Sequence, residues 1–302
     1  MRAQKNGFDI RFFFKPQKPV PYARVKVEVA GQDFSELLTE KDRKIASKEW
    51  AALKSRKGHR AYSRRGGVGS LHATSAGEFT FRPTEFLVSS SAYLTYPRRT
   101  MSAKVYDRMR VSAVACMVAL CDGRFVVQKR SGNVTLGEGL LDSSAAGYAK
   151  IGRGKTIDFE AAAFEKLWRE LGISRKMVGS IELAAVHSSS VDCSGTFDFI
   201  VKTGLASEQV LAAANPQYVG GLEFVRPEDL PRFIFSHFVE KNDIVPEGCA
   251  AMLACLPHAQ FLAECASLSR AGKKILFGAL HAGEFVPAKK QPFIAAKPIA
   301  GN

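Results

Sequence analysis

The stretch AAAFEKLWRELGIS, residues 161–174, carries the clearest local signal in the sequence. Ala163, Leu167 and Leu171 recur every four residues, which is the spacing of a buried helical stripe, and Trp168 continues a flanking apolar row. Gly172 follows at the position where helices often end in the left-handed conformation. The stretch therefore predicts an amphipathic helix over about residues 157–171. On this interpretation the outer, solvated face of the helix holds Glu165, Lys166, Arg169 and Glu170.

Strand and helix patterns alternate on both sides of this helix. Residues 111–130 contain two apolar runs joined by Asp122-Gly123, the strongest short-range signal for a β-hairpin. After the helix, residues 177–190 and 195–204 predict two more strands. A short helix (208–216), a strand that turns into a helix (219–234) and a closing helical region (248–268) follow. This alternation predicts an α/β fold.

The first hundred residues predict a separate α+β accessory domain, residues 1–105. Residues 8–14, 23–31 and 79–96 have strand-like composition, and Thr39 with Asp42 predicts the start of a helix that runs to about Lys54. Residues 64–78 are rich in Gly and Ser, which predicts an exposed and flexible loop. At the other end, residues 257–302 predict a helical and extended tail.

The order of the segments from Val111 to Leu256 resembles that of the Nudix hydrolase family. The resemblance rests on GRFVVQKRS (123–131), SSAAGYAKIGRG (143–154), the helix AAAFEKLWRELGIS, GTFDFIV (195–201) and GGLEFVRPEDLP (220–231). It implies a Nudix-like α/β/α sandwich with a mixed sheet over residues 106–256. It also implies a nucleotide near the end of the second strand, at Lys129 and Arg130.

The helix departs from the family pattern at its acidic positions. The pattern reads Gly, five residues, Glu, seven residues, then Arg-Glu-U-x-Glu-Glu-x-Gly-U, where U is aliphatic. With Gly172 aligned, Glu170 matches the last Glu, but Lys166 and Arg169 stand where two other acids are expected, and Glu165 stands at the Arg. The upstream Glu falls on Ile157 in strict register, or on Arg153 if residues are inserted. Only one of four family acids is therefore retained.

Two hypotheses follow for the site. A Nudix site gathers carboxylates at i and i+4 of one helix to bind Mg²⁺, which neutralises the diphosphate and helps activate water. Here that pair is Lys166 and Glu170, so the first hypothesis is a degenerate metal site without a cofactor, which binds a nucleotide or nucleic acid without Mg²⁺-dependent hydrolysis. The cations expected to hold phosphate are Lys129, Arg130, Arg153, Lys155, Lys166 and Arg169.

The second hypothesis is an active Nudix-type pyrophosphohydrolase of a nucleoside diphosphate linked to another group. It requires Mg²⁺, catalytic roles for Glu170 and Glu165, and metal ligation by Glu170, Glu165 and Glu160. These three residues are five apart, or about 140° of rotation per step, so they do not share one helix face. An active site would therefore need ligands from other loops.

The net charge of +14 favours acidic partners. Residues 41–65 contain ten Lys or Arg residues against Asp42 and Glu49. This composition fits either a nucleic-acid contact through counterion release or a solvated helix face followed by a basic loop. The residues expected to contact nucleic acid are Lys54, Arg56, Lys57, Arg60, Arg64 and Arg65. A third hypothesis, a basic structural component of a nucleoprotein assembly with protein partners, uses this segment instead of a pocket.

Other bulk features point to a cytoplasmic protein that does not enter a membrane. No apolar run reaches the roughly 20 residues that cross a bilayer, and the N-terminal residues lack the apolar core of a signal peptide. The six cysteines form no Cys-x-x-Cys pair, which favours reduced, structural thiols. His187 follows an apolar run, and we interpret it as a hydrogen-bonded structural residue.

Overall fold

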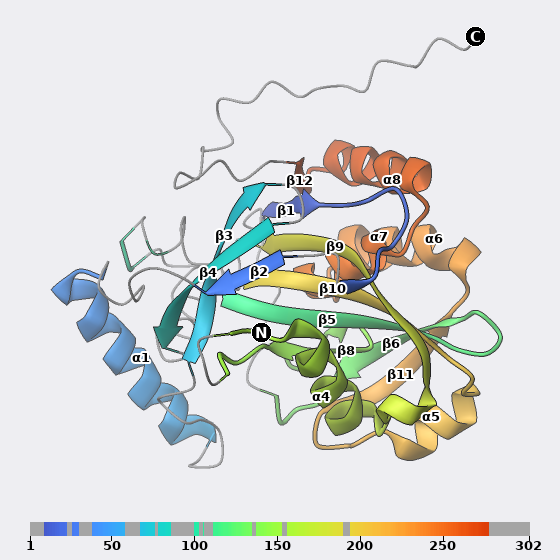
Figure 1. Cartoon of the computed structure of the whole chain (residues 1–302), viewed down its shortest axis with the longest axis horizontal. Coiled ribbons are helices and arrows are strands. Elements are labelled where there is room, and N and C mark those ends of the chain that lie inside the picture. Colours follow the sequence, from blue (N-terminus) through green and yellow to red (C-terminus); the bar gives the residue numbers. More distant parts are fainter. Residues whose placement is uncertain are drawn as a thin grey trace, which may run out of the picture.

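Figure 1 shows the computed structural model of the chain. The structure describes residues 9–22, 26–29, 38–57, 67–75, 78–85, 100–102, 105, 111–134, 137–152, 156–189 and 194–277. Within these residues the fold is mixed α/β, as the sequence predicts, and twelve strands form one sheet. The path of the sheet is β12-β1-β9-β10-β5-β3-β4-β2, and β6 and β8 also pair with β5.

Five of the central strands follow the predicted segments, and two short ones form between residues 131 and 157, where the sequence predicts a loop. They are β5 (Val111–Ala119), β6 (Phe125–Arg130), β7 (Leu141–Asp142), β8 (Ala145–Tyr148), β9 (Val178–Ser189), β10 (Ser194–Thr203) and β11 (Val219–Val225). The hairpin between β5 and β6 turns at Gly123, whose φ of 83° requires glycine or strain. The sheet is mixed because β10 pairs in parallel with β5 and antiparallel with β9.

Helices cover both faces of this sheet, and Figure 1 shows α4 on one side and α7 with α8 on the other. The helices are α1 (Glu40–Lys57), α4 (Phe159–Leu171), α5 (Ser207–Ala213), α6 (Leu230–Phe235), the π-helical turn Ser236–Lys241, α7 (Pro246–Ala254) and α8 (His258–Arg270). Because side chains alternate along a strand, Val114 and Val118 of β5 pack with Leu167 of α4. Met117, between them, packs in the other core with Met252 of α7.

The N-terminal and C-terminal segments add to the same sheet. Strand β1 (Asp9–Phe14) pairs antiparallel with β9 and in parallel with β12 (Lys274–Phe277). Strand β3 (Gly67–Ser75) pairs with β4 (Glu78–Glu85) and meets β5 at Ser70 and Val111, while β2 (Lys26–Val29) pairs with β4. The domain boundaries at 105/106 and 256/257 stay predictions, and hydrogen bonds of the sheet cross both of them.

One local prediction in the N-terminal region is wrong, and one is confirmed. The Gly- and Ser-rich residues 67–75, predicted as a flexible loop, form a strand that pairs along its length with β4 and meets β5 at one position. The helix predicted from Thr39 and Asp42 is α1, and Asp42 N–H donates to Thr39 Oγ1 (3.1 Å) while Thr39 N–H donates to Asp42 Oδ2 (3.1 Å). No helix of the described residues is long and apolar enough to cross a membrane.

Candidate functional site

Helix α4 forms where the sequence predicts it, and both ends are capped. At the N-terminus the Asp158 carboxylate accepts a hydrogen bond from Ala161 N–H (2.8 Å). At the C-terminus Gly172 has a φ of 67°, and its N–H donates to the carbonyls of Leu167 and Trp168. These caps fix where the helix begins and ends, and the packing of Ala163, Leu167 and Leu171 in the core sets which side chains face the sheet.

The burial pattern of α4 corrects the expected solvated face. Lys166 and Glu170, expected in solvent, are each only 4% exposed, whereas Trp168, expected to flank the apolar stripe, is 62% exposed. The cause is the chain that lies beside the helix. Ala146 of β8 donates its N–H to Glu170 Oε2 (3.3 Å), and the segment after α5 donates Asn215 N–H to the Glu170 carbonyl (2.9 Å).

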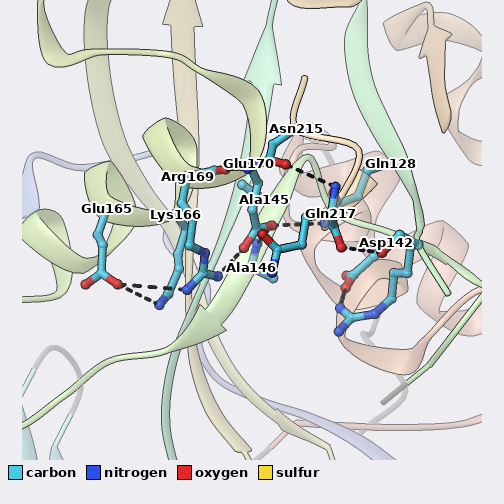
Figure 2. A network of polar contacts seen from close by, with 12 residues as sticks. Gln128, Asp142, Ala145, Ala146, Glu165, Lys166, Arg169, Glu170, Asn215 and Gln217 are labelled. Carbon is cyan, nitrogen blue, oxygen red and sulfur yellow. Dashed lines mark hydrogen bonds and ion pairs between the residues drawn. The ribbon is translucent and has the colours of Figure 1, made fainter. Parts of the chain in front are cut away.

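Glu170 is the centre of a network of polar contacts (Figure 2). Its carboxylate pairs with the Arg169 guanidinium and also accepts from Gln128 Nε2 of β6 (3.3 Å) and from Ala146 N–H. Three donors therefore satisfy this buried carboxylate, as a buried charge requires. Three of the roughly four lone-pair sites of the carboxylate are thus engaged within the chain.

Lys166 lies one turn before Glu170 and has fewer partners. Its Nζ is 3.4 Å from Glu165 Oε1, and a Cβ placed on Gly147 of β8 would come within 3.0 Å of its Cε. Glycine at position 147 thus leaves the space that the lysine stem occupies. Burial, followed by the nearby charge of Arg169, lowers the pKa of Lys166, while Glu165 and Glu170 act in the opposite direction.

The two other acids predicted as metal ligands lie apart from Glu170. Glu165 is exposed and interacts with Lys166 and with Arg169 (3.9 Å); although burial raises its pKa, these cations and Lys150 bring the pKa below its usual value. Glu160 forms an ion pair with Arg175. Among the described residues, no three or more His, Cys, Asp or Glu side chains come together as a metal site. The residues present do not fit the Mg²⁺ site that the resemblance implies.

The predicted phosphate-binding cations reach the network only in part. Arg130 pairs with Asp142 of β7, opposite Gln128 in the sheet, and Lys129 is exposed. Arg169 lies with its guanidinium carbon 4.7 Å from the centre of the Tyr218 ring. The predicted residues Arg153 and Lys155 lie outside the described residues.

Sequence reasoning missed Gln128, Asp142, Asn215 and Tyr218. Gln128 carries a usable signal, because it is a polar residue in the apolar run of β6 and is only 2% exposed. Its Oε1 and the Nε of Arg169 are buried polar atoms without a hydrogen-bond partner. The orphaned acceptor and donor both belong to residues that hold Glu170, so this network has unused hydrogen-bonding capacity.

The remaining candidates lie elsewhere. Lys54, Arg56 and Lys57 belong to the last turns of α1, whereas Arg60, Arg64 and Arg65 lie outside the described residues. An open depression of about 820 Å³ lies at the turn end of β6 and β11, where Arg124 and Phe224 help to line it, and it contains none of the predicted site residues. His187 is fully buried, and its Nδ1 lies 2.7 Å from Asp198 Oδ2, which fits the structural role that we expect for it.

Comparisons with known proteins add little to this description. No protein-family model matches the chain, and no curated protein matches it. One similar solved structure is that of DR0079 from Deinococcus radiodurans. It is 21% identical, covers 49% of this chain and 82% of the other, and superposes with a TM-score of 0.36. A likeness of this degree carries no argument about fold or function.

Proposed function

We propose that this chain is a Nudix-like protein that binds a nucleotide at the α4 network without metal-dependent hydrolysis of a diphosphate. The observation that carries the proposal is the pair at i and i+4 of α4. Lys166 and Glu170 are both buried there, and the Glu170 carboxylate is held by Arg169, Gln128 and Ala146 N–H.

Coordination chemistry supports the loss of the metal. Mg²⁺ requires several oxygen ligands in near-octahedral geometry, and a protonated lysine offers no lone pair. Arg169 is paired with Glu170, and Lys166 interacts electrostatically with it, so positive charge beside this carboxylate repels a divalent cation. The charge that would neutralise a phosphate is thus built into the chain instead of being supplied by a metal.

The charge balance of the network sets an expectation for affinity. Lys166, Arg169 and Arg130 each already face a carboxylate of Glu165, Glu170 or Asp142. A phosphate therefore competes with an internal anion for these three cations. Lys129 and Lys150 are exposed, so they are the cations most accessible to a phosphate. We expect moderate binding that weakens with added salt, because exposed ion pairs are screened.

Titration calorimetry with a panel of nucleoside mono-, di- and triphosphates tests the binding. The proposal predicts that at least one nucleotide binds equally well with EDTA and with Mg²⁺. A strict requirement for Mg²⁺ would favour the alternative, an active pyrophosphohydrolase, and would overturn the proposal. The double variant Lys129→Gln, Lys150→Gln removes the two exposed cations and is expected to weaken nucleotide binding.

Restoring the missing acids tests the loss of the metal. The double variant Lys166→Glu, Arg169→Glu adds two carboxylates beside Glu165 and Glu170, so it should gain Mn²⁺ binding, measured as loss of the free-ion signal in electron paramagnetic resonance. The wild-type chain should leave that signal unchanged. The control Lys176→Glu, Arg232→Glu changes the net charge equally at two exposed positions away from the network. Mn²⁺ binding by the wild type that matches the double variant contradicts the account.

A further inference from the structure

Helix α1 is held in place by one buried face. Asp42, Ala46 and Trp50 recur every four residues and are 0%, 1% and 5% exposed. This spacing keeps the three side chains on one side of the helix, where they are removed from solvent together. The opposite side of α1 is therefore presented to solvent in a fixed orientation.

Asp42 is the anchor of this face. Its carboxylate accepts hydrogen bonds from Ser102 N–H (2.7 Å), Ser102 Oγ (2.9 Å) and Thr39 Oγ1 (2.7 Å). Although burial raises the pKa of this carboxyl, the hydrogen bonds from Ser102 and Thr39 bring it below its usual value. The first acid of the basic segment is thus turned inward and removes no positive charge from the outer face.

The outer face of α1 combines cations with small residues. At 100° per residue, one stripe opposite Asp42 and Ala46 contains Lys41, Lys44, Lys48, Ala51, Ala52 and Ser55, and all six are exposed. Glu40 pairs with Lys44 (2.7 Å). Lys41 and Lys48 form no ion pair with any described residue, so their charge is available to a partner. The small side chains of Ala51, Ala52 and Ser55 continue the stripe beyond Lys48 and permit close approach of an extended polymer.

We propose that this stripe of α1 is a docking surface for the phosphate backbone of a nucleic acid. Lys41 and Lys48 lie seven residues apart, or about 10.5 Å along the helix axis, a length that meets about three nucleotides of one strand. The stripe carries none of the large exposed apolar side chains found among the described residues. A bilayer surface is less suitable because interfacial helices bury an apolar face.

This surface is separate from the α4 network. In Figure 1, α1 lies at the edge of the molecule beside β4, and α4 lies under the central strands. Exposed lysines on α1 would act through charge and require neither Lys166 nor Glu170. Either proposal can therefore be refuted without the other. Nucleotide binding at α4 can be absent while polymer binding at α1 is present, and polymer binding can be absent while nucleotide binding is present.

The test compares two triple variants of the full chain by fluorescence anisotropy with a labelled 20-nucleotide RNA and a 20-base-pair DNA duplex. The stripe variant is Lys41→Gln, Lys44→Gln, Lys48→Gln. The control variant, Lys176→Gln, Arg226→Gln, Arg232→Gln, removes the same charge from exposed positions elsewhere. Far-UV circular dichroism checks that α1 stays folded, since glutamine is a good helix former.

We expect the stripe variant to bind both polymers about 10-fold or more weakly, and the slope of log affinity against log salt to fall by about 2–3, roughly one unit per lost phosphate contact. The control variant should bind within about twofold of wild type. Equal weakening by both variants would mean that net charge alone matters and would overturn the proposal. So would a loss confined to RNA or to DNA, or no nucleic-acid binding by the wild type. A last measurement is sedimentation of the chain with phosphatidylserine vesicles. If the stripe variant loses more vesicle binding than nucleic-acid binding, the proposal is also overturned.

Discussion

The substitution Glu170→Gln measures how much the fold depends on the buried network of α4. The carboxylate accepts from Arg169, from Gln128 Nε2 (3.3 Å) and from Ala146 N–H (3.3 Å). A glutamine side chain keeps the shape but has one acceptor oxygen and turns an NH₂ group toward one of these donors. One lost hydrogen bond to a charged group costs about 1.5–3 kcal/mol, and Arg169 also loses its buried counterion. We expect the free energy of unfolding to fall by about 3 kcal/mol.

The matched control is Glu165→Gln, one turn and one residue earlier on the same helix. Its carboxylate also faces Lys166 and Arg169, but its side chain is 49% exposed. Because exposed ion pairs contribute little, the free energy of unfolding should change by no more than about 0.5 kcal/mol. Urea denaturation followed by far-UV circular dichroism compares the two variants with wild type. Equal costs for both, or no cost for Glu170→Gln, would refute the claim that burial makes Glu170 structural.

Three further variants test separate parts of the account. Lys166→Met removes a buried amine whose folded-state pKa is lowered. Because the unfolded chain binds more protons than the folded chain at high pH, the stability of wild type relative to Lys166→Met should rise with pH up to 10.5. A stability difference that is constant with pH would contradict this. Asp42→Ala removes the buried acid of α1 and should cost about 2–4 kcal/mol of stability at pH 7. Because the folded-state pKa of Asp42 is depressed below 3.8, this cost should decrease as pH drops below about 4, and a cost at pH 2 equal to that at pH 7 would argue against it. Gly172→Ala forces an alanine into a positive φ of 67° and places its Cβ only 2.9 Å from Ala213 Cβ. Thermal unfolding should show that the free energy of unfolding falls by about 1–3 kcal/mol. Unchanged stability would mean that α4 ends differently.

Local signals predicted most elements of the fold. The Asp122-Gly123 turn, the capped helix before Gly172 and the strands β9 and β10 each depend on a pattern contained within about twenty residues. Pairing across the chain could not be predicted in this way. Strand β1 joins β9 and β12, which are more than 160 residues away in sequence. The Gly- and Ser-rich β3 is a strand paired along its length with β4.

The position of helix α4 was predicted from the sequence, but the environment of its polar side chains was not. Helical periodicity groups Lys166 with Glu170, but it does not reveal that β8 and the segment at Asn215 cover this side of α4. Trp168 shows the converse, since an aromatic residue expected near the core points to solvent. The polar Gln128 within β6 completes the network from a strand whose spatial neighbour, α4, lies about forty residues later in sequence.

The central claim is that the α4 network binds a nucleotide without metal-dependent hydrolysis. Phosphorus NMR of dinucleotides and nucleotide sugars, incubated with the wild-type chain and either Mg²⁺ or Mn²⁺, tests this claim most directly. We predict that nucleoside monophosphate is released no faster with the wild-type chain than in buffer alone. Metal-dependent release that Glu170→Gln abolishes, with the variant still folded, would contradict it.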